Sequence, residues 1–256
     1  MKNNLANIKK SKKFLDKGNC VAIPTETVYG LAANAYSNSA VKKIYKLKNR
    51  PKNNPSIVHY YNLKQLKNDC KLNKNFYTLY KKFCPGPITF ILKLNKKSRI
   101  ANSVTNNKNT LAVRFPKNKI TIKLLSLLNY PLAAPSANIS TKISPVSKED
   151  VRDEFGKRIK YILDGGRSNI GLESTIISLV NKPQILRLGG VEISKINKIL
   201  KSNLKFNTNK KKILSPGQGK THYSPGIPIR LNVSKTKPDE AFILIKKRKF
   251  SDKNFF

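Results

Sequence analysis

Short apolar runs alternate along this chain with longer segments whose apolar residues recur at helical spacing. Near the N-terminus, Leu5, Ile8, Phe14 and Leu15 share one face of a helix that Gly18 would end. By the same criteria we expect helices near residues 3–17, 39–48, 62–68, 75–83, 119–128, 148–155 and 194–201. Strands are expected near residues 20–23, 56–60, 88–94, 110–116, 131–134, 159–163, 174–180 and 184–188. This alternation predicts an α/β fold.

Residues that start and stop elements refine these boundaries. Ser39 is a candidate N-cap for the helix at 39–48, and Pro51 forces the chain out of that helix. Ser147 and Asp150 have the spacing of a capping box at the start of the helix at 148–155. Residues 102–109 are polar and predict a loop.

The composition changes after residue 204. Residues 205–227 are rich first in Asn and Lys and then in Gly and Pro, which is typical of a linker with little core of its own. Beyond them, residues 229–233 and 241–245 could form two strands, but the remaining chain is too short for an independent domain. We therefore predict a main domain at 1–204, a linker at 205–227, and a remnant or truncated start of a second domain at 228–256.

The chain is strongly basic, with 52 Lys and Arg residues against 13 Asp and Glu and a formal net charge of +39. Such a charge favours a polyanionic partner such as RNA. The basic residues are nearly all lysines, however, and they are spread along the whole chain among Asn and Ile. Specific nucleic-acid sites cluster their charge and use arginine, so compositional drift explains most of the excess and leaves weak RNA binding as an expectation.

The cysteines indicate a reducing compartment, and the apolar runs do not indicate a membrane-spanning segment. Cys20, Cys70 and Cys84 are odd in number and fit no metal-binding spacing, so free thiols are expected. The N-terminus lacks the apolar segment of a signal peptide, and no apolar run has the length of a membrane span. We expect a cytoplasmic protein.

Polar residues recur where the predicted strands end. The stretch Pro24–Gly30 places hydroxyl, carboxylate and phenol groups after a buried strand. Such positions can meet in one cleft of an α/β sheet. Further strand ends or nearby turns carry His59, Arg114, Ser136, Asn138, Ser174 and Arg187, and the end of one helix carries Lys48 and Arg50. Cations beside neutral hydrogen-bonding groups suit a ligand with phosphates and a carboxylate.

Taken singly, each of these residues has an ordinary structural explanation. His59 could be a packed strand histidine, Arg187 a surface cation and Ser174 the cap of a strand. The sequence contains no HExxH, P-loop or GxGxxG motif, and neither histidine has an obvious Ser or Cys partner for nucleophilic catalysis. The recurrence of polar groups at strand ends is what favours a shared site.

Several motifs together resemble one enzyme family, the YrdC-like threonylcarbamoyl-AMP synthases. The similarity extends in order from about residue 10 to residue 200. A later segment, Ser215-Pro216-Gly217 with His222-Tyr223-x-Pro225, is similar to the longer, two-domain branch of the family. The motifs are Pro24-Thr25-Glu26-Thr27-Val28-Tyr29-Gly30-Leu31, Lys48-x-Arg50, Pro55-x-Ile57-Val58-His59, Pro85-Gly86-Pro87-Ile88-Thr89, Val113-Arg114-x-Pro116, Pro135-Ser136-Ala137-Asn138 and Glu173-Ser174-Thr175-Ile176.

The resemblance implies a fold and an activity. The family has an α/β fold, a twisted open mixed sheet with flanking helices around a basic cavity. It makes L-threonylcarbamoyl-AMP and pyrophosphate from L-threonine, bicarbonate and ATP with Mg²⁺. The product goes to a transferase complex that modifies the adenosine beside the anticodon of certain tRNAs.

The resemblance also implies roles for individual residues. The residues expected to contact threonine are Thr27, His59, Arg114, Ala134 and Ser174. Those expected to contact ATP are Arg50, Asn54, Thr110, Ser136, Ser144, Arg187 and Tyr223. Lys48, Arg50, Ser136 and Asn138 are expected to act in catalysis. Glu26 could hold Mg²⁺ or a neighbouring cation, or could orient its loop.

The chain departs from the family pattern in three places. Leu188 stands where proline is usual, Ser178 stands near a usual acid, and the second domain is nearly absent. Two alternative functions remain: a tRNA- or double-stranded-RNA-binding module without catalysis, and a carbamoyl-transfer domain of a maturation enzyme. The first would not need the Thr, His and Ser side chains at strand ends. The second normally occurs fused to zinc-finger and acyl-phosphatase modules, which this chain lacks.

Overall fold

The computed structural model describes residues 2–51, 53–206, 228–233, 235, 237–241 and 243. The chain divides into two units, Met1–Tyr223 and Ser224–Phe256, which are described separately. The helices of the first unit are α1 (Lys2–Asp16), α2 (Asn38–Lys48), α3 (Leu63–Asp69), α4 (Lys74–Phe83), α5 (Asn102–Thr105), α6 (Lys119–Ser126), α7 (Lys148–Phe155) and α8 (Ile193–Leu200), with a 3-10 turn at Gly156–Arg158.

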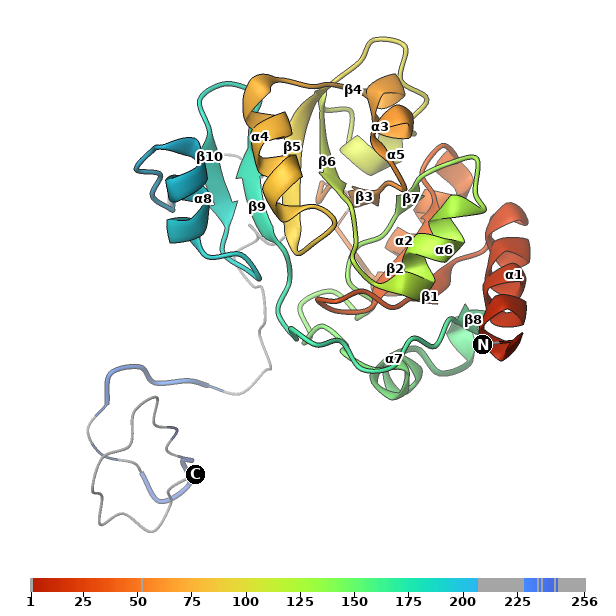
Figure 1. The fold of residues 1–256 in the computed structure, drawn as a ribbon. Helices are drawn as coiled ribbons and strands as arrows, with labels where there is room; N and C mark the ends of the chain where they lie inside the picture. Colours follow the sequence, from red (N-terminus) through yellow and green to blue (C-terminus); the bar gives the residue numbers. More distant parts are fainter. Residues whose placement is uncertain are drawn as a thin grey trace. The chain divides into compact units, whose positions relative to one another are not determined.

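A mixed, open sheet forms the centre of the first unit (Figure 1). The strand order is β10-β9-β5-β6-β3-β7-β2-β1-β8, with β4 paired to β5 beside this path. Parallel and antiparallel pairs alternate irregularly, which confirms the mixed α/β fold predicted from the sequence. The strands are β1 (Val21–Ile23), β2 (Gly30–Asn34), β3 (Ile57–His59), β4 (Cys70–Lys71), β5 (Ile88–Leu94), β6 (Thr110–Arg114), β7 (Leu132–Ala133), β8 (Tyr161–Ile162), β9 (Thr175–Ser178) and β10 (Gln184–Arg187).

The hydrophobic core is divided between the two faces of this sheet. One cluster packs one face of the strands against α2, α4, α5, α7 and α8, with Phe76 and Phe90 in edge-to-face contact. A second cluster packs Val21 and Leu132 on the other face against α1 and α6, which lie side by side. On that second face, buried strand residues around Ile57 and Ile91 form a separate small cluster, with the partly buried Val180 packed against it. The cleft described below opens beside this part of the sheet, since Ile57 lines it.

Local sequence explains where most elements begin. Ser147 accepts the Asp150 N–H, while the Asp150 carboxylate accepts the Ser147 N–H, so the predicted capping box of α7 is confirmed. For α2 the predicted cap was wrong. Ser37, two residues before Ser39, accepts the Ala40 N–H and has the extended backbone of an N-cap.

The structure corrects three further predictions. The expected loop at 102–109 contains the one-turn helix α5. Strand β2 was not predicted, because its sequence, Gly30–Asn34, is mostly alanine, glycine and asparagine, which have weak strand propensity. In the second unit, residues 229–233 do not form the expected strand, whereas most of 241–245 lies outside the described residues.

The described residues of the second unit hold one polar cluster. The Arg230 Nε donates to Glu240 Oε1 at 2.7 Å, and the Lys237 N–H donates to Glu240 Oε2 at 2.9 Å. All three residues are on an exposed surface, where such pairs contribute little to stability. Within the described ranges of both units, no helix combines the length and the apolar character needed to cross a bilayer.

Candidate functional site

One cleft of about 770 Å³, including its open mouth, collects most of the predicted site residues. Parallel pairing of β3 with β6 sets His59 opposite Arg114, so these two side chains arrive together from separate motifs. An isolated bridge between Gly30 and Ser136 brings the loop after β7 to the same place. The predicted residues on the wall of the cleft are Thr27, Lys48, Arg50, Asn54, His59, Arg114, Ala134, Ser136, Asn138, Ser174 and Arg187.

The loop between β1 and β2 forms one wall of the cleft. Thr25 and Thr27 are buried, and the Tyr29 hydroxyl donates to the Gly166 carbonyl at 2.8 Å and accepts the Gly165 N–H at 3.2 Å. The Tyr29 hydroxyl thus fixes this loop to the segment at Gly165 and Gly166. At Gly30 a Cβ would lie 3.3 Å from the Cβ of Ala134, so this close approach favours glycine.

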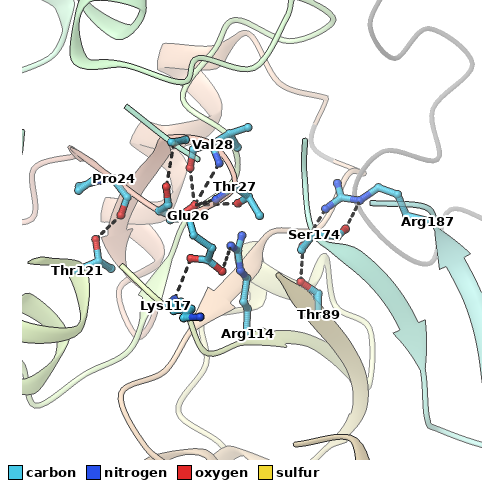
Figure 2. A network of polar contacts seen from close by, with 12 residues as sticks. Pro24, Glu26, Thr27, Val28, Thr89, Arg114, Lys117, Thr121, Ser174 and Arg187 are labelled. Atoms are coloured by element: carbon cyan, nitrogen blue, oxygen red, sulfur yellow. Dashed lines mark hydrogen bonds and ion pairs between the residues drawn. The ribbon is translucent and has the colours of Figure 1, made fainter. Parts of the chain in front are cut away.

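Glu26 pairs with the arginine of the cleft. Its Oε1 lies 2.8 Å from Arg114 Nη2, and its Oε2 accepts the Lys117 N–H at 2.9 Å (Figure 2). Both side chains are largely buried, so the carboxylate holds the guanidinium in one orientation. Arg114 Nε is buried and has no hydrogen-bond partner among the described residues. Because Arg114 also lines the cleft, its guanidinium can bind an anionic ligand there.

Lys48 organises the loop that follows β7. It is 1% exposed, and its ammonium group donates to the Ser136 carbonyl at 2.7 Å and to the carbonyl and side-chain oxygens of Asn138. Burial, and to a lesser extent the neighbouring Arg50, lower the pKa of Lys48 well below its usual value. Ser136 in turn donates to Asn138 Oδ1 at 2.6 Å. Lys48 thus serves first as a structural donor to this loop.

Arg50 is held by the loop that leads into β3. Its Nε donates to the Asn54 carbonyl at 3.2 Å, and its Nη2 donates to the Pro55 carbonyl at 2.8 Å. The Tyr45 hydroxyl also donates to the Asn54 carbonyl, at 2.8 Å. The Oδ1 of Asn54 is buried without a partner among the described residues, although it belongs to a side chain on the cleft wall.

On the opposite wall, Arg187 is joined to the β9 strand end. Its Nη1 lies 2.5 Å from Glu173 Oε2, its Nε donates to the Ser174 carbonyl at 3.0 Å, and its Nη2 donates to Ser174 Oγ at 3.1 Å. Ser144 donates to the other oxygen of Glu173 at 3.0 Å. Four cations and one carboxylate therefore line the cleft, which leaves it net positive.

Some predicted site residues lie elsewhere. Thr110 lines a separate, smaller cavity with Ser56 and Lys108, so the structure does not bring it into the main cleft. Ser144 reaches the cleft only through its bond to Glu173. Tyr223 is outside the described residues. Neither Leu188, which is exposed, nor Ser178 lines the cleft.

Sequence reasoning missed several residues of the cleft wall, among them Ser140, Thr141 and Glu173. Glu173 belongs to a motif that was recognised, but spacing alone does not show which neighbour faces a ligand. Ser140 and Thr141 follow the motif that ends at Asn138. Their place on the cleft wall could have been inferred because they follow Asn138 within three residues along the chain.

His59 should make the fold sensitive to mild acid. The side chain is buried, and burial together with Arg114 lowers its pKa from 6.5 to about 3. Between these two pKa values the unfolded chain binds a proton at this histidine, whereas the folded protein does not. Lowering the pH through this window should therefore lower the unfolding free energy by about 1.4 kcal/mol per pH unit. Denaturant unfolding of the protein and of His59→Gln from pH 7 to pH 4 measures this. The variant should show the shallower decline, and parallel curves would refute the assignment.

Thr141 carries backbone strain at the mouth of the cleft. Its φ is +81°, a conformation that β-branched residues rarely adopt. Thr141→Gly should raise the unfolding free energy by about 1 kcal/mol, because the strain relieved exceeds the added chain entropy of glycine. The matched control is Ser140→Gly, next to it and without a positive φ, which should lower stability. Equal effects of the two substitutions in thermal unfolding would contradict the strain.

Potential metal ligands are not clustered in the part of the chain that the structure describes. Across the described ranges, no group of three or more His, Cys, Asp or Glu side chains is placed to share a metal ion. Glu26 and Glu173 are each paired with an arginine. What the cleft offers instead is a set of fixed cations, hydroxyls and one neutral imidazole, which can bind and orient an anionic substrate without a covalent intermediate.

Comparison with known proteins shows which family this chain resembles. Residues 13–189 match the Sua5/YciO/YrdC family, described as "Telomere recombination". The threonylcarbamoyl-AMP synthase of Pyrococcus abyssi is 39% identical over 222 residues, covering 84% of this chain and 65% of that protein. The Bacillus subtilis protein of the same name is 38% identical, covering 88% of this chain and 66% of that protein.

The structural comparison agrees with the sequence comparison. The crystal structure of P. abyssi Sua5 complexed with L-threonine superposes with a TM-score of 0.81 at 38% identity, covering 85% of this chain and 65% of that one. The chain spans slightly less than two thirds of the length of these relatives. On the match of sequence and fold, the chain belongs to the Sua5/YciO/YrdC family.

Proposed function

We propose that this chain is an enzyme, a nucleotidyltransferase that makes L-threonylcarbamoyl-AMP and pyrophosphate from L-threonine, bicarbonate and ATP. The observation that carries the proposal is the convergence of Arg114, Thr27 and Ser174 with Lys48, Arg50 and Arg187 in one cleft. Relatives with the name threonylcarbamoyl-AMP synthase, and one relative complexed with L-threonine, support the same assignment.

In this proposal the amino acid and ATP contact different sets of residues in the cleft. Arg114, oriented by Glu26, binds the carboxylate of threonine, and the neutral His59 beside it contacts the amino acid without adding charge. Arg50, Asn54, Ser136 and Arg187 bind ATP. The loop at Ser136 and Asn138 is positioned through Lys48.

The reaction needs positioning more than enzyme-derived groups. The threonine amine adds to the carbon of bicarbonate, and water leaves to give a carbamate. A carbamate oxygen then attacks the α-phosphorus of ATP while the bond from that phosphorus to the bridging oxygen breaks, which releases pyrophosphate. Correct orientation of such reactants can lower the barrier by about 7–11 kcal/mol. The fixed arginines stabilise charge that develops on the phosphates.

Mg²⁺ and the macromolecular partners follow from the same proposal. Mg²⁺ would arrive with ATP, coordinated by its phosphates, as is usual for this ion. The product is a mixed anhydride, so a transferase that modifies tRNA is the proposed consumer. The net charge of +39 adds weak RNA binding of low specificity.

The test is pyrophosphate release from ATP by the purified chain. We expect release that requires both L-threonine and bicarbonate, with L-threonylcarbamoyl-AMP detected by mass spectrometry. Release independent of either substrate would refute the proposal. Absence of turnover together with tight, salt-sensitive tRNA binding would favour the RNA-binding alternative.

A further inference from the structure

Two hydroxyl groups on the cleft wall, those of Thr27 and Ser174, are each backed by a buried threonine. Thr25 lies behind Thr27 at 2% exposure, and Thr89 lies behind Ser174 with no exposure. Figure 2 shows Thr89 and Arg187 both reaching Ser174. Because each hydroxyl carries a single hydrogen, the contacts of each pair determine where that hydrogen points.

In the first pair, the Thr25 hydroxyl donates its hydrogen to a backbone carbonyl. Its Oγ1 lies 2.6 Å from the Val28 carbonyl oxygen, which has no other donor among the described residues. A buried carbonyl requires a donor, so the Thr25 hydrogen points to Val28. Thr25 Oγ1 also accepts the Thr27 and Val28 N–H groups, at the longer distances of 3.2 and 3.3 Å. The two threonine hydroxyls lie 2.8 Å apart, which is short enough to require a hydrogen between them, and because the Thr25 hydrogen points to Val28, Thr27 supplies it. Thr27 Oγ1 is left with lone pairs and no hydrogen for the cleft.

At the second pair the arrangement is reversed. Thr89 Oγ1 lies 2.7 Å from Ser174 Oγ, its hydrogen-bond partner within the described part of the chain. If Ser174 donated, the Thr89 hydrogen would be buried without an acceptor, so Thr89 is the donor. Arg187 Nη2 also donates to Ser174 Oγ, at 3.1 Å. Both lone pairs of Ser174 are thereby occupied, and its own hydrogen is available to a ligand.

We propose that Thr25 and Thr89 are positioning residues that give the two cleft hydroxyls opposite hydrogen-bonding polarity. Thr27 accepts a hydrogen bond from an N–H or O–H group of the ligand, and Ser174 donates one to a ligand oxygen. An L-α-amino acid with a hydroxyl side chain supplies both kinds of group. The identity of this ligand rests on the proposed function, whereas the polarity itself rests on the contacts.

The polarity can be tested without any assumption about activity. Neutron diffraction from a deuterium-exchanged crystal locates hydroxyl deuterons directly. We expect the Thr27 deuteron on the line to Thr25 Oγ1, the Thr25 deuteron on the line to the Val28 oxygen, and the Thr89 deuteron on the line to Ser174 Oγ. A Thr27 deuteron that points into the cleft, or a Ser174 deuteron that points to Thr89, would overturn the proposal.

Variants test the consequence for binding. Thr25→Val and Thr89→Val keep the side-chain shape and should each raise the KM for L-threonine about tenfold, with little change in the KM for ATP. Thr25→Ser and Thr89→Ser should restore the KM. The matched control is Thr121→Val in α6, which removes a buried hydroxyl that donates to the Pro24 carbonyl at the start of the same loop and touches no cleft hydroxyl. It should lower stability and leave the KM unchanged.

A comparison of two amino acids identifies which ligand group donates the hydrogen bond to Thr27. With L-2-aminobutyrate, which lacks the threonine hydroxyl, a loss of affinity in Thr25→Val equal to that with L-threonine assigns the amine. A loss confined to L-threonine assigns the hydroxyl. If the parent protein is active and its Thr25→Val and Thr89→Val variants keep the parental KM, the inference is overturned. If the parent protein does not use threonine, the proposed function is overturned, and the neutron result alone decides the polarity.

Discussion

Replacing Arg114 with alanine should raise the KM for L-threonine about 100-fold while the KM for ATP changes little. Arg114 is 4% exposed, and its guanidinium is held on one side by Glu26 with Nε unpaired among the described residues. Two charge-assisted hydrogen bonds to a carboxylate contribute about 1.5–3 kcal/mol each, and a loss of about 2.7 kcal/mol corresponds to 100-fold. Steady-state pyrophosphate release at varied L-threonine measures the change.

Two controls distinguish a loss of threonine binding from a structural disturbance of the cleft. Arg114→Ala leaves the carboxylate of Glu26 without its cation, so the double variant Arg114→Ala/Glu26→Gln removes that charge and should keep most of the KM defect. Arg50→Ala should instead raise the KM for ATP. If both single variants changed both KM values equally, the assignment of Arg114 to threonine and Arg50 to ATP would be wrong.

Lys48→Met should lower turnover at least about 100-fold and the unfolding free energy by roughly 3 kcal/mol. Methionine has a similar length but cannot donate to the Ser136 and Asn138 carbonyls, which would lose a charge-assisted donor in a buried place. The loop would then shift, and a displacement of about 1 Å at a site of this kind can cost 100-fold in rate. Pyrophosphate release and denaturant unfolding measure the two effects.

The control for Lys48 is Lys142→Met in the neighbouring loop. The Lys142 side chain is largely exposed, and its pairing with Glu154 at 3.4 Å is of the weak surface kind. This variant should match the parent in stability and turnover. A Lys48→Met protein as stable and active as the parent would show that the loop does not depend on the lysine.

Several features of the fold could be predicted because local chemistry determines them. The capping box at Ser147 needs only side chains within one turn, and it is present as expected. The meeting of His59 and Arg114 follows from two strand ends and one parallel pairing. By contrast, β2 has a sequence of weak strand propensity and is a strand because β1 and β7 flank it. Tertiary pairing overrides propensity there.

The detailed contacts of the site were beyond sequence reasoning. The open role of Glu26 is resolved by its pairing with Arg114 and with the backbone of Lys117, partners 88 and 91 residues away. The placement of Thr110 beside a different cavity depends on the direction of a side chain at the first residue of β6. Contacts of this kind follow from strand order and register, which apolar patterns do not specify.

The burial of Lys48 gives the protein an internal chemical marker. A reagent that acylates amines will modify the many exposed lysines of this basic chain quickly, whereas the Lys48 amine lies behind the loop that it holds. Its acylation therefore requires that loop to open. Peptide mapping after brief labelling would report how often the cleft wall detaches under native conditions, and a bound nucleotide that contacts Ser136 should slow the modification of Lys48 in proportion to its occupancy.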